Sequence, residues 1–170
     1  MRMAPYPPKY QRNPLLERLR QQIQVESSDG LRLLKSLRNN PLCSLSVDKS
    51  IPCVMVVWKR YVTSAQLRFV HEHILRLLIK HKMCAVLGDD TVLPTIHADD
   101  QRWIVEDWMP RAQAAGLKAC ASKRPLSYFG KLAIHRVHSV APNGVELRSF
   151  ERLEDARGWL QSTARGGVGY

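Results

Sequence analysis

The fold of this chain is indicated most clearly by residues 84–103, CAVLGDDTVLPTIHADDQRW, in which a short apolar run, an acidic loop and a helix start follow one another. The apolar run CAVL predicts a short buried strand. The segment ADDQRWIVEDWMPRAQAAG predicts a helix with Asp99 and Asp100 in its first turn and Gly116 as its stop. Pro110 lies inside that helix and is expected to kink or split it.

Strands and helices alternate on both sides of this stretch. Before it, CSLSVD and CVMVVW predict a hairpin of an outer and a central strand, and Thr63 or Ser64 can cap the helix that follows. After it, LKACAS and VELRSF predict strands, and PLSYFGKLAIHRVHSV and LEDARGWLQS predict helices. The order β-β-α-β-α-β-α-β-α predicts an α/β fold with a mixed, mostly parallel sheet. The apolar stripe of the first helix comprises Leu67, Val70, Ile74, Leu77 and Leu78.

The chain divides into four predicted segments. Residues 1–13 are rich in proline and predict a disordered arm, and residues 14–40 predict a basic amphipathic helical extension. This extension is expected to pack on its own domain, with a partner or a membrane surface as the alternatives. Residues 43–162 predict one domain, and the Gly-rich residues 163–170 predict a flexible tail.

Composition points to a soluble globular protein. The chain is 45% hydrophobic and 24% charged, and it has neither an apolar run long enough for a membrane span nor a secretory signal pattern. We therefore expect a cytoplasmic protein that does not span a membrane. The four cysteines lie far apart without a C-x-x-C pair, which favours reduced thiols over a zinc or redox site.

Charge is distributed unevenly along the chain. The formal net charge is +11, yet residues 83–115 form an acidic island in this basic protein. A basic excess favours binding to nucleic acid or to an anionic surface. No RRM, KH, zinc-finger or Arg-Gly pattern accompanies it, so nucleic-acid binding is kept only as a third alternative.

Three motifs suggest a family. They are VVWKRYVTSAQL, VLGDDTVLPTIHADDQRWIVEDWMPRAQAAGLK and SFERLEDARGWL, and together they extend over about residues 43–162. Their order and spacing resemble the STAS or SpoIIAA-like domain, the fold of anti-sigma-factor antagonists. They are similar in particular to a group of uncharacterised STAS-like proteins of Bacteroidetes. The resemblance implies a regulatory or protein-protein interaction domain.

The switch residue of that family has no counterpart here. In phosphorylatable antagonists a D-S-S-G or D-T-S-G turn leads into the second helix, and its serine or threonine is phosphorylated. The corresponding place is near IHADD, where no hydroxyl stands at the helix start and Thr95 is the nearest one. Asp99 and Asp100 either mimic a phosphorylated switch or are ordinary partners of the helix dipole.

No complete catalytic or metal motif is present. Asp89 and Asp90 are adjacent, so an extended backbone turns them to opposite faces, unlike the D-x-D pair of haloacid-dehalogenase-type phosphatases. The next strand ends in CASKRP without the carboxylate that a receiver-type magnesium pocket needs. His135 and His138 share a helix face but lack a third ligand. We expect no enzymatic activity, catalytic residue, metal or cofactor.

The sequence therefore predicts a non-enzymatic STAS-like domain that binds an unidentified protein, basic in character, or a second copy of itself. The alternative is a domain that binds a lipid or small apolar ligand between the sheet and the helix that Pro110 allows to move. Trp103 and Trp108 are candidate anchors of an interface. The predicted interaction surface comprises Asp89, Asp90, Thr95, His97, Asp99, Asp100, Trp103 and Trp108.

Overall fold

A computed structural model describes residues 42–93 and 95–166. In chain order its elements are β1 (Cys43–Asp48), β2 (Cys53–Trp58), α3 (Ser64–His81), β3 (Ala85–Asp89), α4 (Ala98–Trp103), the π-helix η2 (Ile104–Trp108), α5 (Met109–Ala114), β4 (Ala119–Lys123), α6 (Tyr128–Ser139), β5 (Glu146–Phe150) and α7 (Leu153–Gly166). The predicted order of strands and helices is confirmed. The predicted arm and helical extension, residues 1–40, lie outside the described residues.

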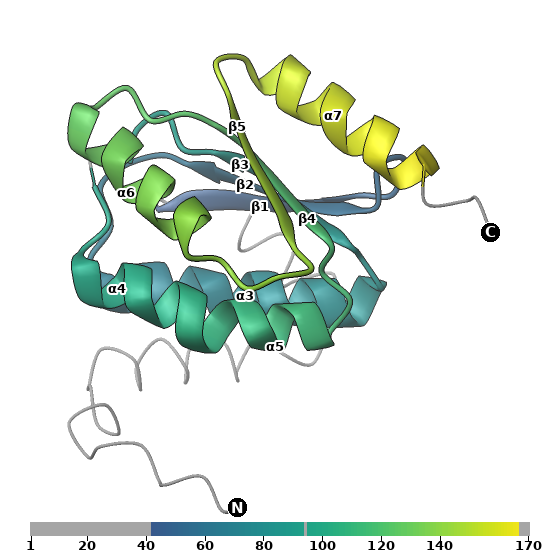
Figure 1. Cartoon of the computed structure of the whole chain (residues 1–170), viewed down its shortest axis with the longest axis horizontal. Coiled ribbons are helices and arrows are strands. Elements are labelled where there is room, and N and C mark those ends of the chain that lie inside the picture. The colour runs from purple at the N-terminus through teal and green to yellow at the C-terminus, as the bar shows by residue number, and fades with distance from the viewer. Residues whose placement is uncertain (1–41, 94, 167–170) are drawn as a thin grey trace, which may run out of the picture. The chain divides into compact units, whose positions relative to one another are not determined.

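The five strands form one sheet in the order β1-β2-β3-β4-β5. Strand β1 pairs antiparallel with β2, and the pairs from β2 to β5 are all parallel. Because each parallel crossover adds a strand on the same side and crossovers are right-handed, their helices are expected on one face. Figure 1 shows α3, α4, α5 and α6 on one face of the sheet and α7 on the other. The predicted mixed, mostly parallel α/β fold is confirmed.

The α7 face is closely packed because its sheet residues are small. Ala85, Ala119 and Ala121 lie beneath α7 and let its Ala156 and Leu160 approach the strands. Phe150 and Trp159 close one side of this core, with their ring centroids 6.0 Å apart. Ala156 and Leu160 are almost fully buried there.

Helix α3 begins and ends with the chemistry that its sequence indicates. The predicted cap Thr63 forms a capping box with Gln66, and Lys82 takes the left-handed conformation just after the last turn. All five residues of the predicted apolar stripe are buried. The stripe therefore holds α3 against the sheet.

Helices α4, η2 and α5 form one continuous helical segment despite Pro110. Regular α-helix would bring the proline ring against the carbonyl group four residues earlier. Here the π-turn of η2 widens the helix just before the proline, and the Met109 N–H donates to the carbonyl oxygen of Ile104. Pro110 thus changes the helix geometry without splitting the helix. The segment ends, as predicted, at Gly116, whose φ is +106°.

Helix α7 extends beyond residue 162, where the sequence predicts the end of the domain. Helix α7 continues to Gly166, so residues 163–166 are helical where the sequence predicted a tail. Thr163 donates its hydroxyl to the carbonyl oxygen of Trp159, which continues the helical pattern. None of the helices in the described ranges is long and apolar enough to cross a membrane.

Two helical glycines give a test of this packing. A Cβ at Gly130 would lie 2.6 Å from the carbonyl oxygen of Leu93 and 2.7 Å from Cβ of Pro125, whereas a Cβ at Gly158 meets nothing within 4 Å. Gly130→Ala should therefore lower the free energy of unfolding by about 1–3 kcal/mol. Gly158→Ala should raise it by about 0.5–1 kcal/mol through helix propensity. Chemical denaturation of both variants measures the two effects. A Gly130→Ala variant that is more stable than the wild type would contradict the close packing of α6 against Leu93 and Pro125.

Candidate functional site: an apolar cavity above the sheet

The face of the sheet opposite α7 carries a row of small residues. Val56, Gly88, Ser122 and Ser149 stand in register on β2, β3, β4 and β5. Side chains on one face of a strand recur every second residue, so the preceding row on the same face is formed by Val54, Val86, Cys120 and Leu147. The row itself is too small to fill the space beneath the helices.

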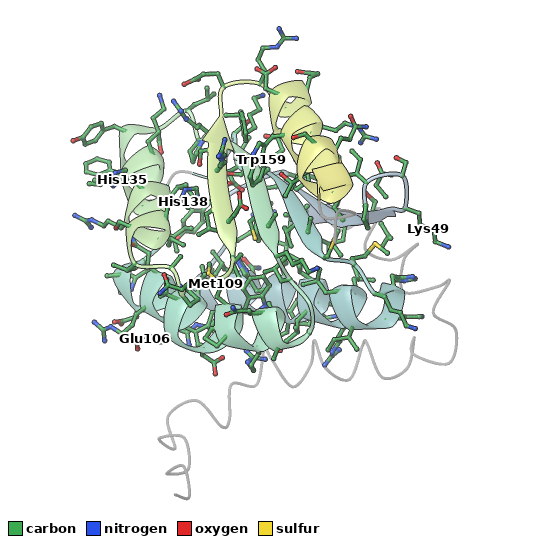
Figure 2. The ribbon with its side chains drawn as sticks, turned by 45° about the vertical axis from the view of Figure 1, so that its right-hand side comes forward. Lys49, Glu106, Met109, His135, His138 and Trp159 are labelled. Carbon is green, nitrogen blue, oxygen red and sulfur yellow. The ribbon has the colours of Figure 1, made fainter. Side chains whose placement is uncertain are left out.

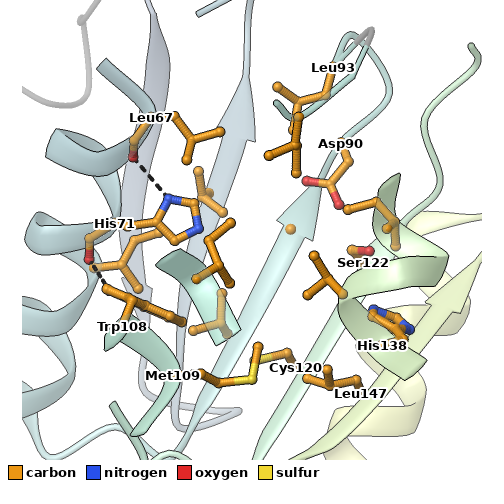
Figure 3. Close-up of a pocket in the computed structure, with 18 of the residues that line it drawn as sticks. Leu67, His71, Asp90, Leu93, Trp108, Met109, Cys120, Ser122, His138 and Leu147 are labelled. Carbon is orange, nitrogen blue, oxygen red and sulfur yellow. Dashed lines mark hydrogen bonds between the residues drawn. The ribbon is translucent and has the colours of Figure 1, made fainter. Parts of the chain in front are cut away.

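A cavity of about 120 Å³ lies at this place, and we call it the inner cavity. Its floor is the sheet, and its walls come from α3, η2, α5, α6 and the loop after β3 (Figure 3). The apolar lining residues include Leu67, Ile74, Leu93, Ile96, Ile104, Met109, Ile134 and Val137 on the walls and Leu147 on the floor. The volume approaches the roughly 150 Å³ of an engineered apolar cavity that holds benzene. The inner cavity therefore has room for one ring or a short branched chain.

Asp90 brings a carboxyl group to this apolar cavity. It follows the last residue of β3 and is 7% exposed. Desolvation by burial raises the pKa of Asp90 to about 7, while hydrogen bonds from Ser122 and Trp58 lower it less, and Asp89 raises it further. Gly88 makes room for this carboxyl group, since a Cβ there would lie 3.2 Å from Oδ1 of Asp90.

His71 lies on the opposite wall, among three tryptophans. Its ring centroid is 6.3 Å from Trp58, 6.0 Å from Trp103 and 5.0 Å from Trp108. The Nδ1 atom lies 2.9 Å from the carbonyl oxygen of Leu67 and must carry a hydrogen, because that oxygen only accepts. Burial lowers the pKa of His71 and favours the neutral ring, which leaves Nε2 as an acceptor.

The π-turn is tied to α3 beside this histidine. The indole N–H of Trp108 donates to the carbonyl oxygen of His71 at 2.7 Å (Figure 3). The widened turn places both Trp108 and Met109 on the cavity wall. π-turns are frequent at functional sites, and this one shapes the cavity directly.

The residues of the predicted interaction surface differ in their burial. Asp90, Asp100 and Trp108 are buried, so they cannot form part of an exposed surface as predicted. Their neighbours are accessible: Thr95, His97 and Asp99 are exposed, and Asp89 and Trp103 are half-buried.

Asp100 is buried because it pairs with α3. Its Oδ1 accepts a hydrogen bond from Nε of Arg68 at 2.7 Å, and the Arg68 guanidinium lies 5.1 Å from the Trp103 ring centroid. Removing one partner of such a buried pair would leave the other charge buried without compensation, which is strongly destabilising. The pair of Asp100 and Arg68 therefore holds α4 against α3. Asp99 remains exposed beside it, with its carboxylate 3.8 Å from Nδ1 of His97.

The adjacent acids Asp89 and Asp90 do not share a pocket. Asp89 accepts hydrogen bonds from the backbone N–H and the hydroxyl of Thr91, whereas Asp90 lines the inner cavity. No group of three potential metal ligands occurs within the described ranges. All four thiols are free, and burial raises the pKa of Cys120, which lines the cavity, to about 12. Such a thiol is inert as a nucleophile.

Comparison with models of known protein families and with curated protein sequences gives no match to this chain.

Sequence reasoning missed His71 and the polar sheet residue Ser122 as parts of a site. His71 stands four residues after Leu67 and three before Ile74, on the apolar stripe of the first helix. A histidine on the apolar face of a helix is a sequence signal for a buried polar group, and it could have indicated this part of the site. The role of Ser122 depends on strand register, which the sequence alone does not give.

The raised pKa of Asp90 gives the protein a specific pH dependence. The folded state holds this proton more tightly than the unfolded chain, so Asp90 lowers the free energy of unfolding as pH rises from about 4 to about 7. The histidines whose pKa is lowered by burial act in the opposite direction below pH about 6.5.

Asp90→Asn isolates the carboxyl contribution. The stability advantage of the variant over the wild type should be larger at pH 8 than at pH 5 by on the order of 2 kcal/mol, because the unfolded wild type is ionised at both pH values whereas the folded wild type releases its proton only near pH 7. Urea denaturation at both pH values measures the difference. Equal stability differences at the two pH values would show that Asp90 is ionised throughout.

Proposed function

We propose that this chain is a STAS-like regulatory domain that binds a small, mainly apolar ligand in the inner cavity. The observation on which this rests is the cavity itself, an apolar hollow with a desolvated carboxyl group at one end and a neutral imidazole on its wall. Binding sites for small molecules are apolar with a few polar groups that fix orientation. The order of elements and the mostly parallel sheet support the STAS-like part of the proposal.

The polar groups define what such a ligand offers. A protonated Asp90 donates a hydrogen bond, and Nε2 of a neutral His71 accepts one. A hydroxyl or carbonyl oxygen on a small apolar frame can accept the hydrogen bond from Asp90. A hydroxyl or N–H group of the ligand can donate to Nε2 of His71. No covalent chemistry is needed for this role, in accord with a regulatory rather than enzymatic function.

Indole N–H resonances provide a direct test. Trp58 and Trp108 line the inner cavity, whereas Trp159 packs on Phe150 at the α7 face. Titration with benzene should shift the Trp58 and Trp108 signals and leave Trp159 unmoved. Phenol should bind more tightly than benzene if Asp90 or His71 pairs with its hydroxyl.

Two matched cysteine substitutions complete this test. Cys120→Met places extra volume in the cavity and should weaken benzene binding at least tenfold, whereas Cys84→Met makes the same change away from it. Benzene shifts that are equal at all indole signals, or that survive Cys120→Met unchanged, would exclude the inner cavity as the site.

A second candidate function is protein binding, favoured by exposed apolar residues at the start of α6. Leu126, Tyr128 and Phe129 are 76%, 73% and 68% exposed, and the Leu126 N–H donates to the carbonyl oxygen of Thr91 in the loop after β3. Exposed apolar residues that cluster in this way are typical of interaction sites. They adjoin the part of the chain that the sequence predicted as an interaction surface.

Paired tyrosine and phenylalanine variants test this candidate. Tyr128→Ser/Phe129→Ser should abolish recovery of partner proteins from native cells, since the apolar contact is lost. Tyr61→Ser, at a residue that is 61% exposed elsewhere, should leave recovery unchanged. Identical partner sets from all three proteins would rule out the α6 surface, and sedimentation of the purified chain would show whether the partner is a second copy.

A further inference from the structure

A second hollow adjoins the inner cavity on the outside of the sheet edge. It lies between α6 and the edge strand β5, has a volume of about 620 Å³, and we call it the outer groove. Its cationic and imidazole side chains are Arg124, Lys131, His135, His138 and Arg148. None of the described residues that line it is acidic. The outer groove therefore favours an anion.

The two hollows share a wall. Ile134, His138 and Leu147 line both the inner cavity and the outer groove. The row of small residues lies on both sides of this boundary, since Ser122 lines the inner cavity and its register partner Ser149 lines the outer groove. Figure 3 shows His138 and Leu147 among the residues that line the inner cavity.

We propose that the natural ligand is a small amphiphilic carboxylate whose apolar tail occupies the inner cavity and whose anionic head lies in the outer groove. This inference rests on the proposed function, because it assigns the tail to the same cavity. The tail is limited by the 120 Å³ volume to one ring or a short branched chain.

Lys131 is the residue that we expect to form an ion pair with the carboxylate of the ligand. It is exposed on α6, and no ion-pair partner for it is found in the described part of the chain. The other two cations are engaged: Arg124 donates to Glu151 at 2.6 Å, and the Arg148 guanidinium lies 5.1 Å from the Trp159 ring centroid. Lys131 can therefore bind an anion without losing an existing contact.

Two further groups at the boundary fit the same ligand. The Oγ atom of Ser149 is buried and has no hydrogen-bond partner among the described residues, so it offers a donor to an incoming oxygen. His138 is half-buried, and burial together with the nearby His135 lowers its pKa. A carboxylate beside His138 would favour the imidazolium and raise that pKa. Figure 2 shows His135 and His138 on the same helix beside β5.

The test compares 3-phenylpropionate with 3-phenylpropanamide, which has the same tail and a neutral head. The carboxylate should bind wild-type protein roughly tenfold more tightly than the amide, as an ion-paired hydrogen bond predicts. Both compounds should shift the indole signals of Trp58 and Trp108, and only the carboxylate should raise the pKa of His138 as followed by NMR titration.

Charge-reversal variants locate the head group. Lys131→Glu should remove the tenfold preference and leave amide binding unchanged, whereas Lys118→Glu makes the same charge change at an exposed residue outside the groove. Higher ionic strength should weaken binding of the carboxylate alone. Equal affinity of acid and amide, or equal effects of the two variants, would overturn the proposal.

The outcomes separate this proposal from the one on which it rests. If benzene and the amide both bind while the acid shows no advantage, the inner cavity is a ligand site and the outer groove is not part of it. If benzene, amide and acid all leave Trp58 and Trp108 unmoved, both proposals fail together.

Discussion

The low side-chain volume of one row on the sheet face opposite α7, at Gly88 and Ser122, shapes the surroundings of the proposed site. Helices cover both faces, and both faces carry small strand residues, but on the α7 side Ala156 and Leu160 of the helix approach the strands and fill the space. On the other side the row through Gly88 and Ser122 leaves a hollow. An apolar hollow of this size holds water poorly, since water needs two to four polar partners. The space is thus more favourable to an apolar ligand than to solvent.

The π-turn accommodates Pro110 and places Trp108 and Met109 on the cavity wall. A regular helix would place the Pro110 ring against a carbonyl group, and the additional residue in the turn relieves that clash. The same turn brings the Trp108 indole to the carbonyl oxygen of His71 and so ties two helices together. The shape of the cavity on this side therefore follows from one proline and one hydrogen bond.

Periodicity was sufficient to predict the elements but not the site. The alternation of strands and helices and the stripe from Leu67 to Leu78 depend on local spacing, which the sequence displays. The cavity depends on which residues of β2, β3 and β4 stand side by side, and register is a long-range property. Asp100 illustrates the same limit: an acid in a first helical turn suggests a surface dipole partner, yet Arg68, 32 residues earlier, buries it.

The arrangement of charge also decides how an amphiphile would be oriented. Transfer of an unpaired carboxylate into an apolar cavity is costly, and a neighbouring carboxyl group that titrates near neutral pH would add repulsion once ionised. A carboxylate in the outer groove instead stays partly hydrated and near Lys131. Burial of the apolar tail is favourable because it removes apolar surface from water, and this happens only when the tail enters the inner cavity. The burial of the tail and the hydration of the carboxylate are therefore favourable together only with the tail inside and the head outside. In the proposed complex the inner cavity would select the apolar frame of the ligand, and the outer groove would select its charge.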